Sequence, residues 1–472
     1  MKITIIGASK SGYSAAILAN KLGYEVFISE NQSKDNFLNE IEILDKLSIS
    51  YEFGGHSENI LDCDFAITSP GAPPSSFPIR LLEENKIEII SELEFAYQNL
   101  INKENIIAIT GTNGKTTTTS LIHYILEKSG KSSLVSGNIG TPLCDLVLDL
   151  NNNLNDKINQ NTILVIECSS YQLDKIKTFT PKVAMILNLS PDHLAYHSTF
   201  QQYLDAKWKI SCNMNENNLL ILNNDDATLM GKLNSIGEDR NSFNVKTFSL
   251  SNTMSDIFVE NDIIYIKTNY INSKNQVDNY SIIKEELMNI ASINLPGVHN
   301  IYNSLAAILA VRAFEVRNED IRDALHTFQG VEHRLEYVET INNIRFINDS
   351  KATNINSTWF ALNSYDKPII WIAGGRAENN PYEELDSTVK KHVKLVICIG
   401  EETENIYNHY CTITKVVKAS DMNDAITISL KEANKNDVVL FSPACKSFDM
   451  FANYEHRGQV FKEVVKNNKS NN

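Results

Sequence analysis

A glycine turn at residues 108–119, between an apolar run and a helical stretch, most constrains the fold of this chain. The apolar run at residues 106–109 predicts a buried strand, and a helix is expected from Thr116 onward. Strand, glycine turn and helix start form the arrangement of a phosphate-binding loop. Gly111 and Gly114 allow backbone N–H groups to face an anion, and the start of the helix adds partial positive charge.

The side chains of this turn suit a nucleoside triphosphate. Lys115 can reach the outer phosphates, and the Thr116 hydroxyl can ligate Mg²⁺. We therefore predict that ATP binds along the turn, at Gly111, Thr112, Asn113, Gly114, Lys115, Thr116 and Thr117. The alternative is a plain glycine turn before an ordinary helix, because Ile109 stands where the common pattern has Gly or Ala.

Length and charge narrow the class of protein. A chain of 472 residues has room for two to four domains. A formal net charge of −15 argues against nucleic acid as a partner, since its phosphates need a basic face. The seven cysteines form no C-x-x-C pair, which favours reduced thiols packed as small apolar groups. The sequence contains no apolar stretch long enough for a bilayer, and its start is typical of a strand rather than a signal peptide, so we expect a cytoplasmic enzyme without membrane partners.

Alternating strands and helices predict an α/β protein of three domains, with parallel sheets. These are a Rossmann-like domain at residues 1–99, a central P-loop domain at 100–330 and a C-terminal Rossmann-like domain at 331–472. Strands are expected at residues 3–6, 26–29, 65–68, 106–110, 163–167, 183–188, 219–222, 344–347, 369–373, 395–399 and 438–441. Residues 245–268 are interpreted as antiparallel hairpins inserted in the central sheet, and the polar tail after Phe461 is expected to fray.

The first section carries a glycine pattern that is incomplete for a dinucleotide. Residues 7–12 read Gly-Ala-Ser-Lys-Ser-Gly, so Ser9 replaces the second glycine of the usual fingerprint. Glu30 stands where a ribose-binding acid would lie. An NAD-binding protein is therefore a weak alternative, and a pocket for another nucleotide is the better interpretation.

Several polar residues follow predicted strands, where ligands of parallel sheets bind. Glu167 is a candidate second Mg²⁺ ligand or a strand-end cap, and His193 is a ligand or a structural residue. Asn300 and Asn303 share a helical face and could grip a purine. By spacing alone, Lys207 is a surface lysine. Arg334 and the segment 349–354 suit a carboxylate or phosphate.

Together these elements resemble the Mur ligase family, whose members form amides in peptidoglycan precursor synthesis with ATP. The resemblance covers the whole chain and rests on Thr-Gly-Thr-Asn-Gly-Lys-Thr at 110–116, Glu-Cys-Ser-Ser at 167–170, Asp-His at 192–193, Gly-Val-His-Asn at 297–300 and His-Arg at 333–334. Within the family, residues 349–354 and 442–449 resemble the D-glutamate-adding member. Sister Mur enzymes and folylpolyglutamate synthases are the nearest alternatives, and a P-loop protein that only switches conformation is a more distant one.

The resemblance implies substrates and roles for individual residues. UDP-N-acetylmuramoyl-L-alanine and D-glutamate would bind at Ser9, Lys10, Ser11, Glu30, Asn31, Ser69, Gly71, Asn138, Ser169, Lys351, Thr353, Ser447, Phe448 and Tyr454. ATP would also contact Asn300, Asn303, Arg334 and Asp349. Catalysis would depend on Lys115, Glu167, His193, Lys207 and Arg334, and two Mg²⁺ ions on Thr116, Glu167, His193 and Lys207. In the family the residue matching Lys207 is carbamylated, and a monomer is expected.

One position departs from the family pattern. Relatives often carry a lysine shortly after the glycine pair that matches Gly374 and Gly375, where it serves the incoming amino acid. Here Glu378 stands at that position, and Arg376 is a possible substitute with different geometry.

Overall fold

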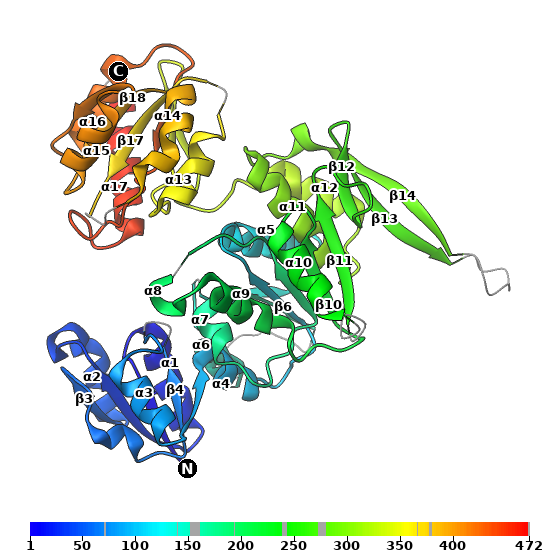
Figure 1. The fold of residues 1–472 in the computed structure, drawn as a ribbon, viewed down its shortest axis with the longest axis vertical. Helices are drawn as coiled ribbons and strands as arrows, with labels where there is room; N and C mark the ends of the chain where they lie inside the picture. Colours follow the sequence, from blue (N-terminus) through cyan, green and yellow to red (C-terminus); the bar gives the residue numbers. More distant parts are fainter. Residues whose placement is uncertain are drawn as a thin grey trace. The chain divides into compact units, whose positions relative to one another are not determined.

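The protein divides into two compact units. The computed structural model describes residues 1–69, 72–138, 140–151, 161–192, 194–237, 243–271, 280–365, 367–376 and 380–470. One unit comprises Met1–Ser292 with Tyr302–Leu325, and the other comprises Ile293–Ile301 with His326–Asn472. Each unit is α/β, and the described residues form three sheets, which confirms the predicted fold class (Figure 1). The division into three sections near residues 99 and 330 stays a prediction.

The first sheet is wholly parallel and has the strand order β3-β2-β1-β4-β5. Its strands are β1 (Lys2–Ile6), β2 (Glu25–Glu30), β3 (Ser50–Phe53), β4 (Phe65–Thr68) and β5 (Glu88–Ser91). Its helices are α1 (Lys10–Lys21), α2 (Leu38–Lys46), α3 (Phe77–Glu84) and α4 (Glu92–Gln98). The chain order reverses between β1 and β4, so the loops that leave these strands splay apart and open a crevice for a ligand.

The central sheet has nine strands in the order β14-β13-β12-β11-β10-β9-β6-β8-β7. These are β6 (Ile106–Thr110), β7 (Ser133–Gly137), β8 (Ile163–Glu167), β9 (Val183–Ile186), β10 (Leu219–Asn223), β11 (Asn244–Ser249), β12 (Ile257–Glu260), β13 (Ile263–Ile271) and β14 (Tyr280–Asn289). The strand before the glycine turn, β6, lies between β8 and β9. The C-terminal ends of these three neighbours therefore place their polar residues together.

The expectation for residues 245–268 is wrong in part. Strand β11 pairs in parallel with both β10 and β12, so it continues the parallel sheet. Only β12, β13 and β14 pair antiparallel, and the β13–β14 hairpin extends beyond the rest of the sheet (Figure 1). A short turn at Asn261 and Asp262, both with positive φ, allows the reversal after β12.

The helices of the central section lie between and after its strands in the chain. They are α5 (Lys115–Lys128), α6 (Leu143–Asn151), α7 (Ser170–Asp174), α8 (Leu194–His197), α9 (Phe200–Trp208), α10 (Ala227–Ser235), α11 (Val298–Arg312) and α12 (Asn318–Thr327). One apolar cluster extends from the first sheet into the central one and includes Leu93 of α4 and Val147 of α6. The two sheets of this unit therefore share a buried boundary.

A buried carboxyl lies at that boundary. Glu92, the first residue of α4, is 1% exposed. Its Oε1 accepts a hydrogen bond from the backbone N–H of Cys144 in α6 at 2.8 Å, and its Oε2 has no hydrogen-bond partner among the described residues. Burial raises the pKa of Glu92 to about 7, and nearby Asp145 adds to the rise. Ionising the Glu92 carboxyl in the folded protein therefore costs free energy.

This pKa makes stability depend on pH with a defined sign. The folded pKa of Glu92 lies above its usual 4.5, so its contribution is fully present at low pH and is lost as pH rises toward about 7. We expect Glu92→Gln to gain stability over the parent between about pH 5 and pH 8, by roughly 3 kcal/mol at most. Urea unfolding at both pH values measures the difference; the same difference at both would contradict the assignment.

The second unit contains a six-stranded sheet in the order β15-β16-β20-β17-β18-β19. Its strands are β15 (Glu336–Ile341), β16 (Ile344–Asn348), β17 (Ile369–Gly374), β18 (Val393–Ile399), β19 (Lys415–Lys418) and β20 (Val438–Phe441). Its remaining helices are α13 (Ile355–Leu362), α14 (Asp386–His392), α15 (Thr403–Tyr410), α16 (Met422–Glu432) and α17 (Tyr454–Ser470). The β15–β16 pair is antiparallel, and the other strand pairs of this sheet are parallel.

The expectation of a fraying tail after Phe461 is wrong over the described residues. Helix α17 continues to Ser470, because Phe461 and Val465 are buried one turn apart in the core with Phe441. Between them Glu463 is exposed, while Lys462 is largely covered and pairs with Glu332 and Glu336.

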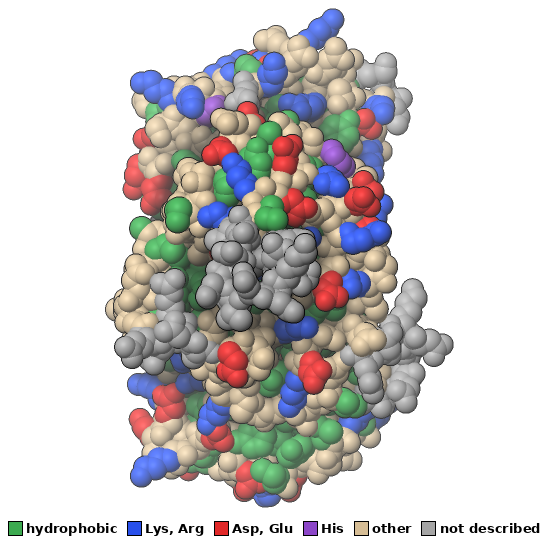
Figure 2. Space-filling model, turned by 90° about the vertical axis from the view of Figure 1, so that its right-hand side faces the viewer, with side chains coloured by type: hydrophobic (Ala, Val, Ile, Leu, Met, Phe, Trp, Pro, Cys, Tyr) green, Lys and Arg blue, Asp and Glu red, His purple; other side chains and the backbone are tan. Residues whose placement is uncertain are grey.

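The surface carries charges of both signs. On the face drawn in Figure 2, Lys and Arg side chains are interspersed with Asp and Glu side chains. Within the described residues, none of the helices is both long and apolar enough to cross a membrane.

Candidate functional site

The glycine turn forms the predicted phosphate-binding loop between β6 and α5. Gly111 and Gly114 have φ values of +150° and +84°, which side chains rarely adopt. At Gly114 a Cβ would also come within 2.3 Å of Asn303 Oδ1, so a larger residue would displace the amide beside the loop. Lys115 Nζ donates to the carbonyls of Gly111 and Thr112, at 2.9 and 2.8 Å.

A second strand end buttresses this loop. Asn188, which follows β9, accepts from Asn113 N through its side chain at 2.9 Å and from Thr112 N through its carbonyl at 3.0 Å. The Thr112 hydroxyl donates to Ser190 O and lies 3.0 Å from the Tyr203 hydroxyl. These contacts fix the loop geometry with side chains from β9 and α9.

Lys207 is buried, so the interpretation of its spacing as a surface position is wrong. The side chain is 1% exposed, and Nζ donates to Gly111 O at 2.9 Å and lies 4.7 Å from the centre of the Tyr203 ring. Burial lowers the pKa of Lys207 well below its usual value, and Lys115 lowers it further by repulsion. The Nζ atoms of both lysines thus donate to the Gly111 carbonyl.

Glu167 ends β8 beside the loop. It is 2% exposed, and its Oε1 accepts from the Asn138 side-chain amide at 3.0 Å. Its Oε2 is buried and has no hydrogen-bond partner in the described structure. A buried carboxylate oxygen without a donor is costly unless a cation satisfies it. Together with the hydroxyl of buried Thr116 at the start of α5, this oxygen fits the hard oxygen ligands that Mg²⁺ prefers.

The structure gives different outcomes for two further predicted residues. His193 lies outside the described residues. Ser169 is the N-cap of α7, where its hydroxyl and Gln172 form a reciprocal capping box. Its local structural role is therefore clear, while a substrate contact stays a prediction.

The two amides of α11 lie in different surroundings. Asn303 is 4% exposed and lies against Gly114 of the loop. Asn300 is equally buried, and its side-chain amide donates to Pro296 O at 2.7 Å in the turn that precedes the helix. The division between the compact units passes through this helix, between Ile301 and Tyr302.

The first sheet contains a cavity of about 320 Å³ at the C-terminal ends of its strands. Of the predicted substrate residues, Ser9, Glu30, Asn31 and Ser69 line it. Glu30 Oε2 accepts from Ala8 N at 2.7 Å and Oε1 from Gln32 N at 2.9 Å, so this acid orders the backbone around the cavity.

The remaining predicted residues of this region are not among the cavity's lining. Lys10 Nζ donates to Gly140 O of the central section at 2.6 Å, and Ser11 lies half-buried in the first turn of α1. Gly71 lies outside the described residues. Sequence interpretation also missed several lining residues, which are Gln32, His56, Ala72, Pro73, Ser76, Phe77 and Pro78.

In the second unit, the loops after β16 and β20 lie at one edge because the two strands are parallel neighbours. Asp349 Oδ2 accepts from the Ser442 hydroxyl at 2.8 Å, and burial raises the pKa of Asp349 to about 7 against the lowering effect of Arg334. Arg334 is half-buried, and its Nε has no hydrogen-bond partner among the described residues.

Most of the residues predicted to bind D-glutamate lie in these same loops, and Tyr454 begins α17. Lys351 Nζ lies 5.4 Å from the centre of the Tyr454 ring. Ser447 is buried, Phe448 is 59% exposed and Thr353 is half-buried. The structure thus gathers Lys351 and Tyr454, whereas Glu378 lies outside the described residues.

Arg457 of α17 fastens the two loops and was missed in the sequence. It is 1% exposed, donates to Ser350 O at 2.8 Å and donates to Cys445 O at 3.0 Å. Burial lowers its pKa to about 10. Its position in the sequence, just before the polar tail, gave no signal of this role.

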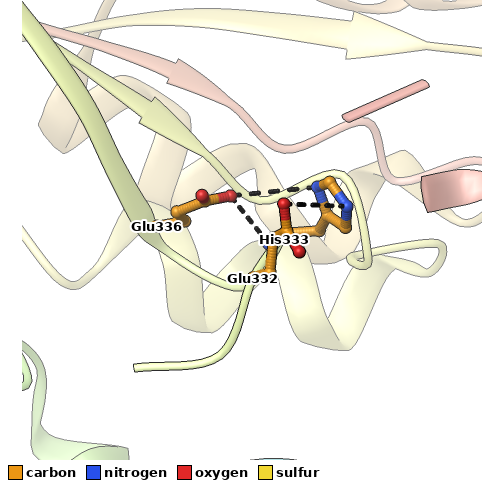
Figure 3. A group of neighbouring side chains, drawn as sticks. All are labelled: Glu332, His333 and Glu336. Carbon is orange, nitrogen blue, oxygen red and sulfur yellow. Dashed lines mark hydrogen bonds and ion pairs between the residues drawn. The ribbon is translucent and has the colours of Figure 1, made fainter. Parts of the chain in front are cut away.

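A nearby group, Glu332, His333 and Glu336, has the composition of a metal site (Figure 3). Both carboxylates already have a cationic partner, because Lys462 Nζ pairs with Glu332 at 2.5 Å and with Glu336 at 2.7 Å. His333 Nδ1 lies 2.9 Å from the Asn348 side-chain amide. We interpret the group as a structural ion-pair cluster that stabilises the turn carrying Arg334.

Comparison with known proteins agrees with this arrangement. Residues 2–77 match the MurD N-terminal domain, 109–311 the Mur ligase middle domain and 333–445 the Mur ligase glutamate ligase domain. The UDP-N-acetylmuramoylalanine–D-glutamate ligase of Chloroherpeton thalassium is 39% identical over 99% of this chain and 98% of its own length. The enzyme of that name from Clostridioides difficile is 36% identical over 99% and 98%.

Solved structures share the fold at lower identity. The UDP-N-acetylmuramate–alanine ligase of Thermotoga maritima gives a TM-score of 0.57 at 20% identity, covering 99% of this chain and 100% of that one. The MurF ligase of Thermotoga maritima in complex with ADP gives 0.56 at 17% identity, covering 94% and 95%. The chain therefore belongs to the Mur ligase family, and within it to the group that includes the UDP-N-acetylmuramoylalanine–D-glutamate ligases.

Proposed function

We propose that the chain joins D-glutamate to UDP-N-acetylmuramoyl-L-alanine with cleavage of ATP, as a monomer in cytoplasmic peptidoglycan precursor synthesis. The names of the full-length relatives and the match to the MurD N-terminal domain support this choice of substrates. The observation that carries the chemistry is the burial of Lys207 against Gly111 of the phosphate-binding loop. A lysine in this position contacts the phosphate-binding loop rather than solvent.

ATP is needed because a carboxylate is a poor acyl donor. The L-alanine carboxylate attacks the γ-phosphorus of ATP, the bond to the β,γ-bridging oxygen breaks, and an acyl phosphate and ADP form. The D-glutamate amine then attacks the acyl carbon, and the tetrahedral intermediate expels phosphate to leave the amide. Both reacting groups of the first step are anionic, so Lys115 and Arg334 would offset their repulsion.

Lys207 suits conversion to a carbamate. Only a neutral amine adds CO₂, and the lowered pKa of Lys207 supplies one. Addition of CO₂ to the neutral amine forms an N–C bond, releases one proton and leaves a negative charge beside Lys115. The resulting anion attracts the Lys115 ammonium group.

The residues present fit Mg²⁺ at two positions. Thr116 and Glu167 would hold one ion, since hydroxyl and carboxylate oxygens suit Mg²⁺, and the carbamate of Lys207 would offer oxygens to the other, where the family resemblance also places His193. When bound, the ions would neutralise charge on the transferring phosphoryl group. The buried and unsatisfied Glu167 Oε2 supports this assignment.

The other predicted residues divide among the three ligands. UDP would lie at Ser9, Lys10, Ser11, Glu30, Asn31, Ser69 and Gly71, and Asn138 and Ser169 would border the acceptor. The adenine would lie near Asn300 and Asn303, with Asp349 serving ATP. Lys351, Thr353, Ser447, Phe448 and Tyr454 would bind D-glutamate. His193 is the candidate base that makes the incoming amine neutral.

The test is release of ADP and phosphate by the full chain with UDP-N-acetylmuramoyl-L-alanine, Mg²⁺ and a panel of amino acids. We expect release to depend on D-glutamate and to yield one amide for each ADP. Release that is equal without D-glutamate, or that follows another amino acid, would contradict the proposed specificity.

A further inference from the structure

The cavity of the first sheet contains a histidine whose protonation can be deduced from its partners. His56 lines the cavity and follows β3, two strands away from the glycine loop of β1. Its Nδ1 lies 2.7 Å from the Ser29 hydroxyl oxygen. That hydroxyl in turn lies 2.5 Å from Glu52 Oε1.

The Ser29 hydroxyl has one proton to donate, and Glu52 takes it. Although burial acts to raise it, the hydrogen bonds from Ser29 and Ser57 hold the pKa of Glu52 below its usual value, so this carboxylate is ionised and only accepts. The oxygen of Ser29 must therefore accept from His56, and His56 carries its proton on Nδ1. Burial also lowers the pKa of His56, against the raising effects of Glu52 on β3 and Glu30 on β2. The neutral ring consequently presents Nε2 as an acceptor.

The free nitrogen is available to a ligand. Nδ1 accounts for the hydrogen bonding of His56 within the described residues, and Nε2 is not among the buried atoms that lack a partner. By contrast, each carboxylate oxygen of Glu30 in the same cavity already accepts a backbone N–H. An N–H donor entering the cavity would thus find its least occupied acceptor at His56.

The rest of the lining suits a flat ring. Phe77 is 50% exposed although it lines the cavity, and Ala72, Pro73 and Pro78 add apolar surface beside it. An exposed aromatic face is a stacking platform for a nucleobase. A volume of about 320 Å³ is at the lower end of small-ligand pockets, which a base and its sugar would fill.

We propose that His56 determines recognition of the nucleotide's base, by accepting the imide N–H of uracil at Nε2 while Phe77 packs against the ring. This inference rests on the proposed function for the identity of the nucleotide. It extends that function by assigning base selection to a residue held in one tautomer by Ser29 and Glu52.

The experiment is a titration of the full chain with uridine diphosphate and with its analogue methylated on the imide nitrogen. The parent should bind the methylated analogue about three- to tenfold more weakly, since a hydrogen bond is lost. His56→Asn keeps an amide N–H near Ser29 but removes the distal acceptor, so it should weaken uridine diphosphate by a similar factor and no longer distinguish the two ligands. His56→Gln places an acceptor near Nε2 and should recover part of the affinity.

A pH series gives a readout that a structural role would not move. With UDP-N-acetylmuramoyl-L-alanine, whose diphosphate has no ionisation between about pH 5 and 8, parent affinity should fall as His56 becomes protonated, and His56→Asn should show no such fall. If the variant is unstable, the parent's methyl discrimination and pH series decide the matter.

Equal binding of both ligands by the parent would overturn the inference. An inactive chain that still discriminates the methylated base would refute the proposed ligase activity and leave this inference standing.

Discussion

Lys207→Ala is expected to reduce D-glutamate-dependent ADP release by about 10³-fold or more. The reason is that the variant removes the buried amine that donates to Gly111 O, and with it the proposed carbamate. The fold should tolerate the loss, because burial and the neighbouring Lys115 lower the pKa of Lys207, so its side chain brings no stabilising charge to the folded state. Initial rates and thermal unfolding midpoints measure the two effects.

Small carboxylates provide the decisive arm of this experiment. Acetate or formate can enter the space left by the shortened side chain and replace the missing anion, so they should restore part of the activity to Lys207→Ala. Lys209→Ala is the matched control, since Lys209 lies two residues later in the chain. Its side chain is 42% exposed and pairs with Asp174 at 2.7 Å. Full activity of Lys207→Ala without added carboxylate would refute the carbamate.

Glu167→Gln is expected to lower the turnover number by about 10²- to 10³-fold while leaving the protein at least as stable as the parent. The amide can still accept from Asn138, so the local hydrogen bond survives. Only the negative charge is lost, because the buried Oε2 of Glu167 accepts no hydrogen bond from the described residues. A metal ligand therefore predicts lost activity with retained stability.

A strand-end cap predicts something else. If Glu167 only ordered the end of β8, the glutamine variant would keep its activity, and raised Mg²⁺ would not improve it. We expect raised Mg²⁺ to recover part of the rate in Glu167→Gln and to leave the control Glu216→Gln, at an exposed position, unchanged. Activity equal to the parent at every Mg²⁺ concentration would contradict the metal assignment.

The phosphate-binding loop was predictable from sequence because its requirements are local. Gly111 and Gly114 have positive φ, which favours glycine, and Lys115 begins helix α5. The geometry of the loop is therefore evident from the identity of these three residues. The buried strands were also evident as apolar runs, although β9 ends at Ile186 rather than at residue 188. Short strands with mixed exposure, such as β3 and β19, left no comparable pattern.

Residues whose roles depend on distant partners escaped the sequence. Lys207 looks like any helical lysine until β6 and α9 bring it to Gly111, and only the family resemblance pointed to it. Arg457 gains its role from contacts with Ser350 and Cys445, which are 107 and 12 residues away. His56 depends on β3 lying beside β2, and the pairing of these strands is a property of the sheet.

Isotope transfer tests the central claim, which is that ATP activates the acceptor carboxylate as an acyl phosphate. UDP-N-acetylmuramoyl-L-alanine is prepared with the heavy isotope of oxygen in its L-alanine carboxylate, and the phosphate released with D-glutamate is analysed by mass. The account predicts one labelled oxygen in each phosphate, because the bridging oxygen leaves with phosphorus when the amine attacks. Phosphate that carries no label, alongside normal amide formation, would contradict it.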